Sequence, residues 1–332
     1  MDIEKMLTLV EERLSRCRIL VTGDVMLDKY YYGEVTRISP EAPVPINHIT
    51  RQKETLGGAA NVAHNLALLG CDTLLAGFVG EDYHCRSLKE KLVENGIDHA
   101  GLVPTNRPTT TKMRIIGGHQ QMMRLDFEST EPLEKIYIDK FLAFVRCKLA
   151  ESIDAIVVSD YAKGTCSEVT TTAIIEAAHA HGVPVIIDPK GANWTKYRGA
   201  DYITPNVKEI NEILIDPIKN TDAEVLKAAH YIMRKYRIKN VLATRSENGV
   251  TLVREGEEVH IPTRVQEVFD VSGAGDTVIA VLAAGLAGGL KGRDAAFLAN
   301  LAASVVVRKL GTYAVSREEL KEALRELPRE EA

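Results

Sequence analysis

Residues 270–277 read Asp-Val-Ser-Gly-Ala-Gly-Asp-Thr and lead directly into an apolar run over 278–290. Gly273, Ala274 and Gly275 are small enough to let a ligand approach the backbone, and the first N–H groups of the following helix are free to bind an anion such as phosphate. Asp276 would repel that phosphate unless it takes part in the reaction, for example by accepting a proton from an attacking hydroxyl. The pairing predicts phosphoryl transfer. Taken alone, Asp276 also fits an ordinary helix cap.

The composition is that of a soluble globular protein. The chain has 332 residues, of which 45% are hydrophobic and 26% are charged, and this fits one large domain with or without an appendage. The net charge of -5 and the interspersed charges exclude a broad basic surface for nucleic acid. Any basic site must therefore be local.

The five cysteines are scattered and form no Cys-x-x-Cys pair. Neither a zinc site nor a disulfide framework is expected, and a reducing compartment fits best. The N-terminus lacks a signal-peptide pattern, and the most apolar helix, about 13 residues long, is too short to span a bilayer. We therefore expect a cytoplasmic protein with no membrane and no nucleic-acid partner.

Short apolar runs alternate with helical patterns along most of the chain, which predicts a mostly parallel sheet covered by helices. The first strand, 18–25, ends in Gly-Asp and makes Asp24 and Asp28 candidate site residues, although each alone also fits a turn. The segment 57–61, Gly-Gly-Ala-Ala-Asn, opens a helix. Its glycines permit either ligand contact or close packing on the sheet, and Asn61 in an apolar first turn favours ligand contact.

Two β-prone segments interrupt the alternation. Residues 30–49 carry three prolines, and residues 109–127 fit a hairpin around Gly117-Gly118-His119. Together they predict a small separate sheet, the lid sheet, formed by residues of about 28–52 and 108–127. The core would then comprise about 18–27, 53–107 and 128–332 within a single domain spanning 1–332.

The expected hairpin is unusually basic for an acidic protein. Lys112, Arg114 and Arg124 lie on its strands near Asp126. They either grip an anionic substrate or are solvated charges that protect an edge strand. Two arginines and one lysine suit a sugar phosphate better than a neutral sugar.

Apolar residues alternate with these charges along the hairpin, namely Met113, Ile115, Met123 and Leu125. They would form one apolar face that a small sugar cannot cover. We therefore expect a homodimer in which two lid sheets pair. The alternative is a monomer whose lid sheet folds onto its own core.

Three successive strands, 154–159, 183–187 and 202–204, are followed by polar residues. In an open α/β sheet, ligands bind at the carboxyl ends of strands, so these residues form a candidate ring: Asp160, Lys163, Asp188, Lys190, Asn206 and Glu209. Asn206 and Glu209 also fit a capping box. The turn after the strand 241–244 suits nucleotide contacts, and the nucleotide candidates are Thr244, Ser246, Gly249 and Asn300.

Two of these motifs, 57–61 and 270–276, resemble in sequence and order the two signatures of the ribokinase-like (phosphofructokinase-B) carbohydrate kinases. The resemblance implies a three-layer α/β/α core with a mostly parallel central sheet and a small β-sheet lid. Within that family, further segments resemble the kinases of bacterial nucleotide-activated heptose synthesis: 23–28, 37–45, 124–128, 159–164 and 187–191. In some of these relatives a nucleotidyltransferase domain follows. Here we expect a separate enzyme to add the nucleotide.

The resemblance implies ATP-dependent phosphorylation of O1 of D-glycero-D-manno-heptose 7-phosphate for lipopolysaccharide or surface polysaccharide synthesis. Asp276 would be the base, and Gly273, Ala274 and Gly275 would hold the transferred phosphoryl group. Asn206 and Glu209 would bind Mg²⁺ through water, and a monovalent cation such as K⁺ is a further candidate cofactor. Lys163 and Lys190 would offset phosphate charge. The sugar would be bound by Asp24, Asp28, Gly57, Gly58 and Asn61, and its 7-phosphate by Lys112, Arg114 and Arg124 beside Asp126.

Three alternatives stay open. Another sugar or sugar-phosphate kinase of the same family would share these motifs. A non-catalytic sugar-phosphate sensor would keep the lid sheet yet lose the base, whereas this chain has Asp276. A nicotinamide-dependent oxidoreductase is disfavoured because Gly273-Ala274-Gly275 lacks the third glycine and lies near the C-terminus. The anomer of the product is not fixed by the sequence.

Overall fold

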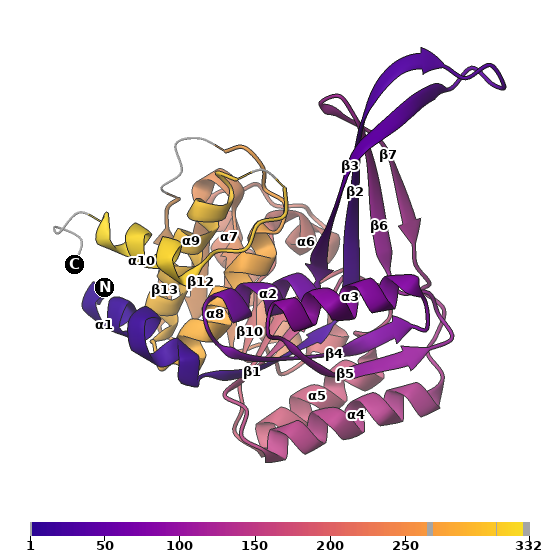
Figure 1. Ribbon diagram of the computed structural model, residues 1–332. Helices are drawn as coiled ribbons and strands as arrows, with labels where there is room; N and C mark the ends of the chain where they lie inside the picture. Colours follow the sequence, from indigo (N-terminus) through magenta and orange to yellow (C-terminus); the bar gives the residue numbers. More distant parts are fainter. Residues whose placement is uncertain (1, 264–267, 310, 328–332) are drawn as a thin grey trace.

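The computed structural model describes residues 2–263, 268–309 and 311–327. Its centre is a nine-stranded sheet in the order β13-β12-β11-β10-β9-β8-β1-β4-β5 (Figure 1). All neighbours in it pair in parallel, except that β12 is antiparallel to both β11 and β13. The strands are β1 (Arg18–Gly23), β4 (Asp72–Gly80), β5 (Asp98–Thr105), β8 (Ala155–Ser159), β9 (Val185–Asp188), β10 (Tyr202–Ile203), β11 (Asn240–Thr244), β12 (Val250–Arg254) and β13 (Glu257–Ile261).

Helices cover both faces of this sheet and make two hydrophobic cores. One core contains residues of α1 (Ile3–Thr8), α2 (Ala59–Leu68), α3 (Tyr83–Glu94), α8 (Ala274–Ala287), α9 (Gly292–Val306) and α10 (Arg317–Arg325). The other contains residues of α4 (Lys135–Ala150), α5 (Glu168–Ala180), α6 (Val207–Glu212) and α7 (Asp222–Tyr236). The central strand shows why both faces need cover, since Ile19 and Val21 enter the first core and Leu20 enters the second. The expected three-layer α/β/α core is confirmed.

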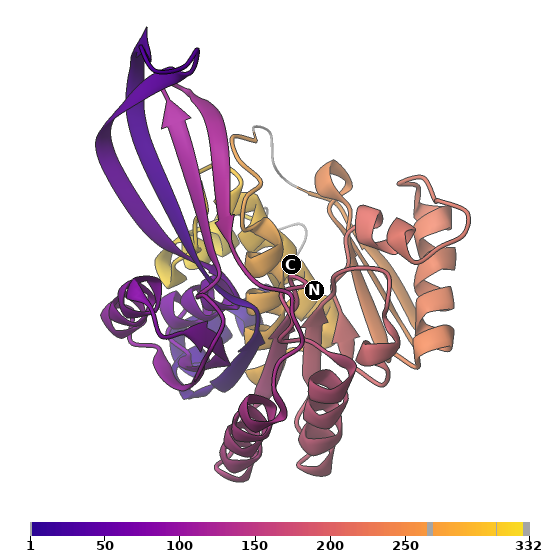
Figure 2. The same cartoon turned by 90° about the vertical axis from the view of Figure 1, so that its right-hand side faces the viewer.

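The lid sheet is a separate four-stranded sheet in the order β3-β2-β6-β7. Its strands are β2 (Val25–Ile38), β3 (Pro45–Gly58), β6 (Thr111–Gly117) and β7 (Gln120–Phe127). β2 pairs with β3 and β6 with β7 in antiparallel fashion, while β2 and β6 are parallel. Figures 1 and 2 show its outer part standing clear of the core, while Val25 of β2 and Leu56 of β3 pack in the first core.

The two faces of the lid sheet differ in chemistry. In the register, Lys112 lies beside Asp28 and Asp126, and Arg114 lies beside Tyr30 and Arg124, so these side chains share one face. Met113 pairs with Leu125 and Ile115 with Met123 on the opposite face. Met123 and Leu125 are exposed. The expected apolar face is therefore present and uncovered in the single chain.

Among the described residues, no helix is long and apolar enough to cross a bilayer. The longest, α4, has 16 residues.

Candidate active site

The site is built around the N-terminus of α8. Gly273 caps this helix with a φ of 81°, a backbone conformation that glycine adopts without strain. A Cβ on Gly273 would lie 3.2 Å from the side-chain nitrogen Nδ2 of Asn61, whereas a Cβ on Gly275 would have no heavy atom within 4 Å. Among the described residues, the N–H groups of Gly275 and Asp276 have no backbone partner. This first turn can therefore accept an anion, as the sequence predicts.

Asp276 is buried beside this anion site and receives a hydrogen bond on each carboxylate oxygen. Asn61 donates from Nδ2 to Oδ2 at 2.7 Å, and the Tyr161 hydroxyl donates to Oδ1 at 2.9 Å. Burial raises the pKa of Asp276 to about 6, although these two hydrogen bonds oppose the rise. The nearby Asp28 carboxylate raises the pKa further and Lys112 lowers it. A carboxylate with this pKa is ionised at neutral pH and can still hold a proton during turnover.

Asn61 reaches Asp276 because α2 packs on α8. Asn65, one helical turn further along α2, donates to the Asn61 carbonyl at 2.9 Å and accepts the Thr277 hydroxyl at 2.9 Å. The two glycine-rich motifs predicted from the sequence thus meet in space. Gly57 leaves room for Asp28, since a Cβ at Gly57 would lie 2.5 Å from its Oδ2.

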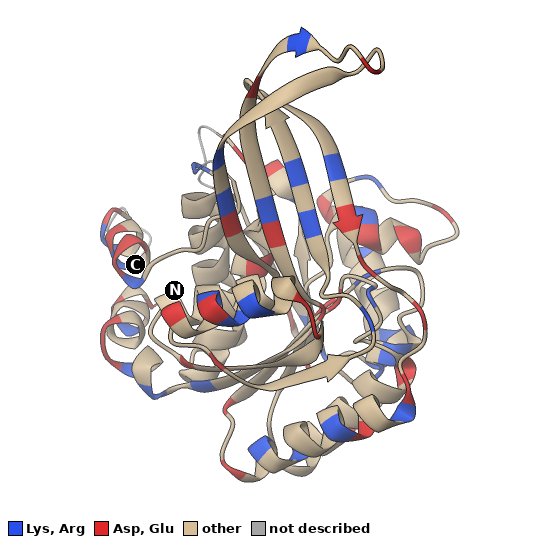
Figure 3. Cartoon of the chain, turned by 45° about the vertical axis from the view of Figure 1, so that its right-hand side comes forward, with Lys and Arg blue, Asp and Glu red and all other residues tan. Residues whose placement is uncertain are grey.

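The lid sheet brings cations toward Asp276, and Figure 3 shows Lys and Arg on its strands. Arg114 donates from Nη1 to Asp28 Oδ1 at 2.6 Å, and Arg124 forms a bidentate pair with Asp126 at 2.7 and 2.8 Å. The Lys112 ammonium lies 5.4 Å from the centre of the Tyr161 ring, and burial lowers its pKa.

Asp24 has a different setting from the one expected for a sugar ligand. It is buried, and its carboxylate accepts the backbone N–H groups of Tyr161, Lys163 and Thr165 at 2.8 to 3.0 Å. Both of its oxygens are therefore engaged in holding the loop that follows β8. Gly58, with a φ of 54°, packs against the carbonyl of Asp24 rather than facing open space.

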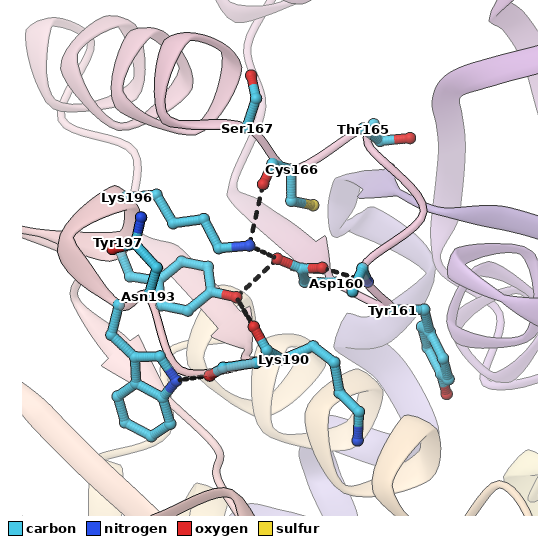
Figure 4. A network of polar contacts seen from close by, with 12 residues as sticks. Asp160, Tyr161, Thr165, Cys166, Ser167, Lys190, Asn193, Lys196 and Tyr197 are labelled. Atoms are coloured by element: carbon cyan, nitrogen blue, oxygen red, sulfur yellow. Dashed lines mark hydrogen bonds and ion pairs between the residues drawn. The ribbon is translucent and has the colours of Figure 1, made fainter. Parts of the chain in front are cut away.

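Asp160 anchors the same loop from its other side (Figure 4). Its carboxylate accepts the Tyr197 hydroxyl at 2.6 Å, the Ala162 N–H at 2.7 Å and the Lys196 ammonium. The Tyr197 hydroxyl in turn accepts the N–H of Lys190 at 2.9 Å. Two neighbouring strand-end loops are thus tied together under the site.

The two lysines of the predicted ring are each paired with a carboxylate. Lys163 binds Glu128 at 2.7 Å, and Lys190 binds Glu209 at 2.9 Å. Asn206 and Glu209 form the capping box that the sequence also allowed. Lys163 is therefore turned toward Glu128 in this structure, and Glu209 is held by both its cap and its lysine.

Asp188, a member of the predicted ring, is the carboxylate at the end of β9. Burial raises its pKa well above the ordinary value, and the charges of Glu209 and Asp276 raise it further. Among the described residues, no three His, Cys, Asp or Glu side chains cluster as metal ligands. The paired Asn206 and Glu209 fit a hydrated Mg²⁺ held mainly by substrate phosphates, and they do not form a protein cage for the ion.

A cavity of about 290 Å³ adjoins the anion site. All four nucleotide candidates from the sequence line it, together with Ala274 and Gly275: Thr244, Ser246, Gly249 and Asn300. Its other walls include Val250, Val271 and Val278, so the cavity is partly apolar. Asn300 donates to the Pro262 carbonyl at 2.9 Å, so it also shapes the wall.

The sequence interpretation missed two residues of this region. Tyr161 was noted only within a motif, yet it contacts Asp276 directly. Arg245 is buried between Thr244 and Ser246, which line the cavity, and it binds Asn220, Asp222 and Thr251. The contact of Tyr161 has no local signature, because Asp276 lies 115 positions away.

A family model described as pfkB family carbohydrate kinase matches residues 17–319. The chain is 46% identical over 308 residues to the bifunctional protein HldE of Pectobacterium atrosepticum, covering 92% of this chain and 63% of that protein. It is 44% identical over 309 residues to the D-beta-D-heptose 7-phosphate kinase of Bordetella bronchiseptica, covering 93% and 96%. The chain thus spans less than two thirds of the length of the bifunctional relative.

Solved structures show the same fold. Ribokinase from Thermotoga maritima matches with a TM-score of 0.72 and 25% identity, covering 93% of this chain and 99% of that one. Phosphofructokinase-2 from Escherichia coli matches with a TM-score of 0.75, 18% identity and coverage of 93% and 98%, and supports the fold alone. The ribokinase-like fold expected from the sequence is confirmed.

The raised pKa of Asp276 predicts that Asp276→Asn stabilises the protein at neutral pH. A carboxyl with an ordinary pKa of 3.8 that titrates near 6 in the folded protein costs stability as the pH rises through this window. An amide does not ionise, and the Asn61 side chain can turn to keep a hydrogen bond. Between pH 4 and pH 7.5, the variant should gain on the order of 1–3 kcal/mol of unfolding free energy relative to wild type. Denaturant unfolding at each pH measures this difference.

Asp139→Asn is the matched control, because Asp139 is an exposed carboxylate that pairs with Lys135 on α4. The difference in unfolding free energy between Asp139→Asn and wild type should change little over the same pH range. An Asp276→Asn difference that stays constant with pH would show that Asp276 titrates normally.

Proposed function

This chain belongs to the pfkB family of carbohydrate kinases, and we propose that it transfers the terminal phosphoryl group of ATP to O1 of D-glycero-D-manno-heptose 7-phosphate. The observation that carries the proposal is Asp276, a buried carboxylate of raised pKa beside the open N-terminus of α8. The sugar class is supported by the relatives of 44 to 46% identity, which include a D-beta-D-heptose 7-phosphate kinase.

The reaction assigns one role to each side of the site. O1 of the sugar attacks the γ-phosphorus, the bond to the bridging oxygen of ADP breaks, and the proton of the O1 hydroxyl passes to Asp276. The free N–H groups of Gly275 and Asp276 face the phosphoryl group as negative charge develops on it. The products are ADP and the heptose 1,7-bisphosphate, and Asp276 then returns its proton to solvent.

ATP would occupy the cavity next to α8, with its base against the valine walls and its phosphates toward Ala274 and Gly275. Bound Mg²⁺ would neutralise phosphate charge there. Asn206 and Glu209 would hold its water ligands, because their side chains are already engaged in the cap. K⁺ is a further candidate cofactor for the proposed reaction.

Asp276→Asn should lower the turnover number at least ~10²-fold while leaving the binding of ATP and sugar phosphate nearly intact, as expected when a general base is lost. A coupled assay of ADP release with heptose 7-phosphate, other sugar phosphates and free sugars measures it. Because the variant is expected to be at least as stable as wild type at neutral pH, a loss of activity cannot come from unfolding.

The same assay decides between the candidate functions. Preference for a hexose phosphate or ribose would point to another kinase of the family. Binding of sugar phosphate without any ADP release would point to a sensor. Near-normal turnover of Asp276→Asn would remove Asp276 as the base.

The lid sheet should bind the 7-phosphate, and Lys112 should matter most. Arg114 and Arg124 are each neutralised by a carboxylate, whereas Lys112 has no carboxylate within hydrogen-bond distance among the described residues. Replacing any of the three cations by Ala should raise KM for the sugar phosphate far more than KM for ATP, with the largest rise for Lys112→Ala.

Lys29→Ala is the control, because Lys29 is also on the lid sheet but pairs with Glu54 on the opposite face at 2.6 Å. It should leave KM for the sugar phosphate nearly unchanged. If the three variants on the site face behave like Lys29→Ala, the cations only protect a sheet edge.

We also propose that two chains pair through the apolar faces of their lid sheets. On this face, Met123 is 56% exposed and Leu125 is 41% exposed. A second copy of the chain would cover the face and protect the sheet edges. Light scattering at micromolar concentration should then give about twice the chain mass of 36.5 kDa.

Leu125→Glu should dissociate that dimer, because it places a charge in the centre of the proposed interface. Ile215→Glu is the control, since Ile215 is exposed at 98% and lies outside the lid sheet. A wild-type mass of one chain, or equal behaviour of the two variants, would refute pairing through this face.

A further inference from the structure

Tyr161 lies in the loop after β8, and its side chain reaches Asp276. Its hydroxyl lies 2.9 Å from Oδ1 of Asp276, and Asn61 serves the other oxygen. We propose that Tyr161 is a positioning residue, which orients the Asp276 carboxylate and, together with Asn61, sets how tightly it holds a proton. The inference rests on the proposed function, in which Asp276 is the base, and adds a residue to its machinery.

The loop is built to hold this tyrosine in place. Asp24 accepts the N–H groups of Tyr161 and of two further loop residues, and Asp160 accepts the Ala162 N–H. Ala162 has a φ of 57°, a left-handed conformation that a non-glycine residue adopts only when its surroundings enforce it. Two buried carboxylates therefore fix the backbone on both sides of the Tyr161 side chain.

The side chain leaves the loop on the side away from this anchor. In Figure 4, Tyr161 points away from the Lys196 and Tyr197 side chains that hold Asp160. Its ring lies under the Lys112 ammonium of the lid sheet, at 5.4 Å, and its hydroxyl meets Asp276. Tyr161 thus makes no hydrogen bond of its side chain within the described residues other than the one to the base.

The chemistry of the pair fixes the direction of the hydrogen bond. Burial raises the pKa of Tyr161 well above its ordinary value, and the charges of Asp276 and Asp188 add to this rise. The phenol therefore stays protonated and donates to the ionised carboxylate. A hydrogen bond to the charged form favours that form. Without it, Asp276 holds its proton more tightly and is less often ready to accept one from the sugar.

Other groups also face Asp276 and must be held constant in a test. They come from α2, β2, β6 and the end of β9: Asn61, Asp28, Lys112 and Asp188. Removing only the Tyr161 hydroxyl leaves all four in place. Tyr161→Phe is therefore the informative variant.

Tyr197→Phe is the matched control. It also removes one phenol hydroxyl that donates to a buried carboxylate of the same loop, but its acceptor is Asp160 rather than Asp276. A purely structural role of the loop would make both variants behave alike. A positioning role of Tyr161 separates them.

Two measurements test the inference on the whole chain. The first follows the ¹³C carboxyl resonance of Asp276, assigned with Asp276→Asn, through a pH titration of the free protein. The second is the pH profile of kcat/KM with the sugar phosphate that wild type turns over best. In Tyr161→Phe, the pKa of Asp276 and the acidic limb of the profile should both move up by about one unit. At pH values below the limb, kcat/KM should fall about tenfold, and the difference should shrink at high pH.

Tyr197→Phe should leave both the titration and the limb in place, even if it lowers the thermal stability. An unchanged Asp276 titration in Tyr161→Phe, or a loss of kcat/KM that is the same at every pH, would overturn the inference. The carboxyl titration needs no substrate. If wild type fails to phosphorylate heptose 7-phosphate, the proposed substrate is wrong, while the role of Tyr161 is still decided.

Discussion

The rest of the site depends on keeping one carboxylate, Asp276, buried and still ionisable. An isolated charge in a protein interior is costly unless hydrogen bonds stabilise it, and here Asn61 and Tyr161 supply one donor to each oxygen. These donors are 215 and 115 positions away along the chain. This hydrogen-bonded carboxylate can therefore form only when α2, the loop after β8 and α8 are all in place, so its setting depends on the complete α/β core.

Two other carboxylates at the strand ends, Asp24 and Asp160, hold the backbone of the loops. Asp24 accepts three N–H groups of the loop after β8, and Asp160 joins that loop to the one carrying Lys190. This division follows from what lies within hydrogen-bond reach of each oxygen. An aspartate that accepts three backbone N–H groups is held in place by them, whereas Asp276 lies beside free helix N–H groups and an open cavity.

Much of this could be predicted from the sequence, because the fold follows from patterns that are local. Alternating apolar runs gave the parallel sheet, and the two glycine-rich motifs gave the helix N-termini of the site. The sequence analysis did not predict β5, because Gly101 and Pro104 within it are residue types that strands rarely contain. Pairings such as Arg114 with Asp28 were also out of reach, because they depend on the register between β2 and β6 across 86 positions. The contacts of Asp24 with the loop after β8 could not be predicted either, because they join residues 137 to 141 positions apart.

The lid sheet shows that the number of cations on a surface does not by itself measure how strongly that surface attracts an anion. Three cations on β6 and β7 suggest a strongly positive grip, yet Asp28 and Asp126 pair with the two arginines, so of these three only Lys112 has no carboxylate within hydrogen-bond distance among the described residues. A phosphate that reaches this face meets one ammonium directly and must share each arginine with its carboxylate. An arginine has five N–H donors and can serve both partners, so the pairs orient the guanidinium groups before the substrate arrives. If this face binds a phosphate, as proposed, the carboxylates weaken the attraction but fix the geometry, so the face would discriminate by the position of the phosphate as well as by its charge.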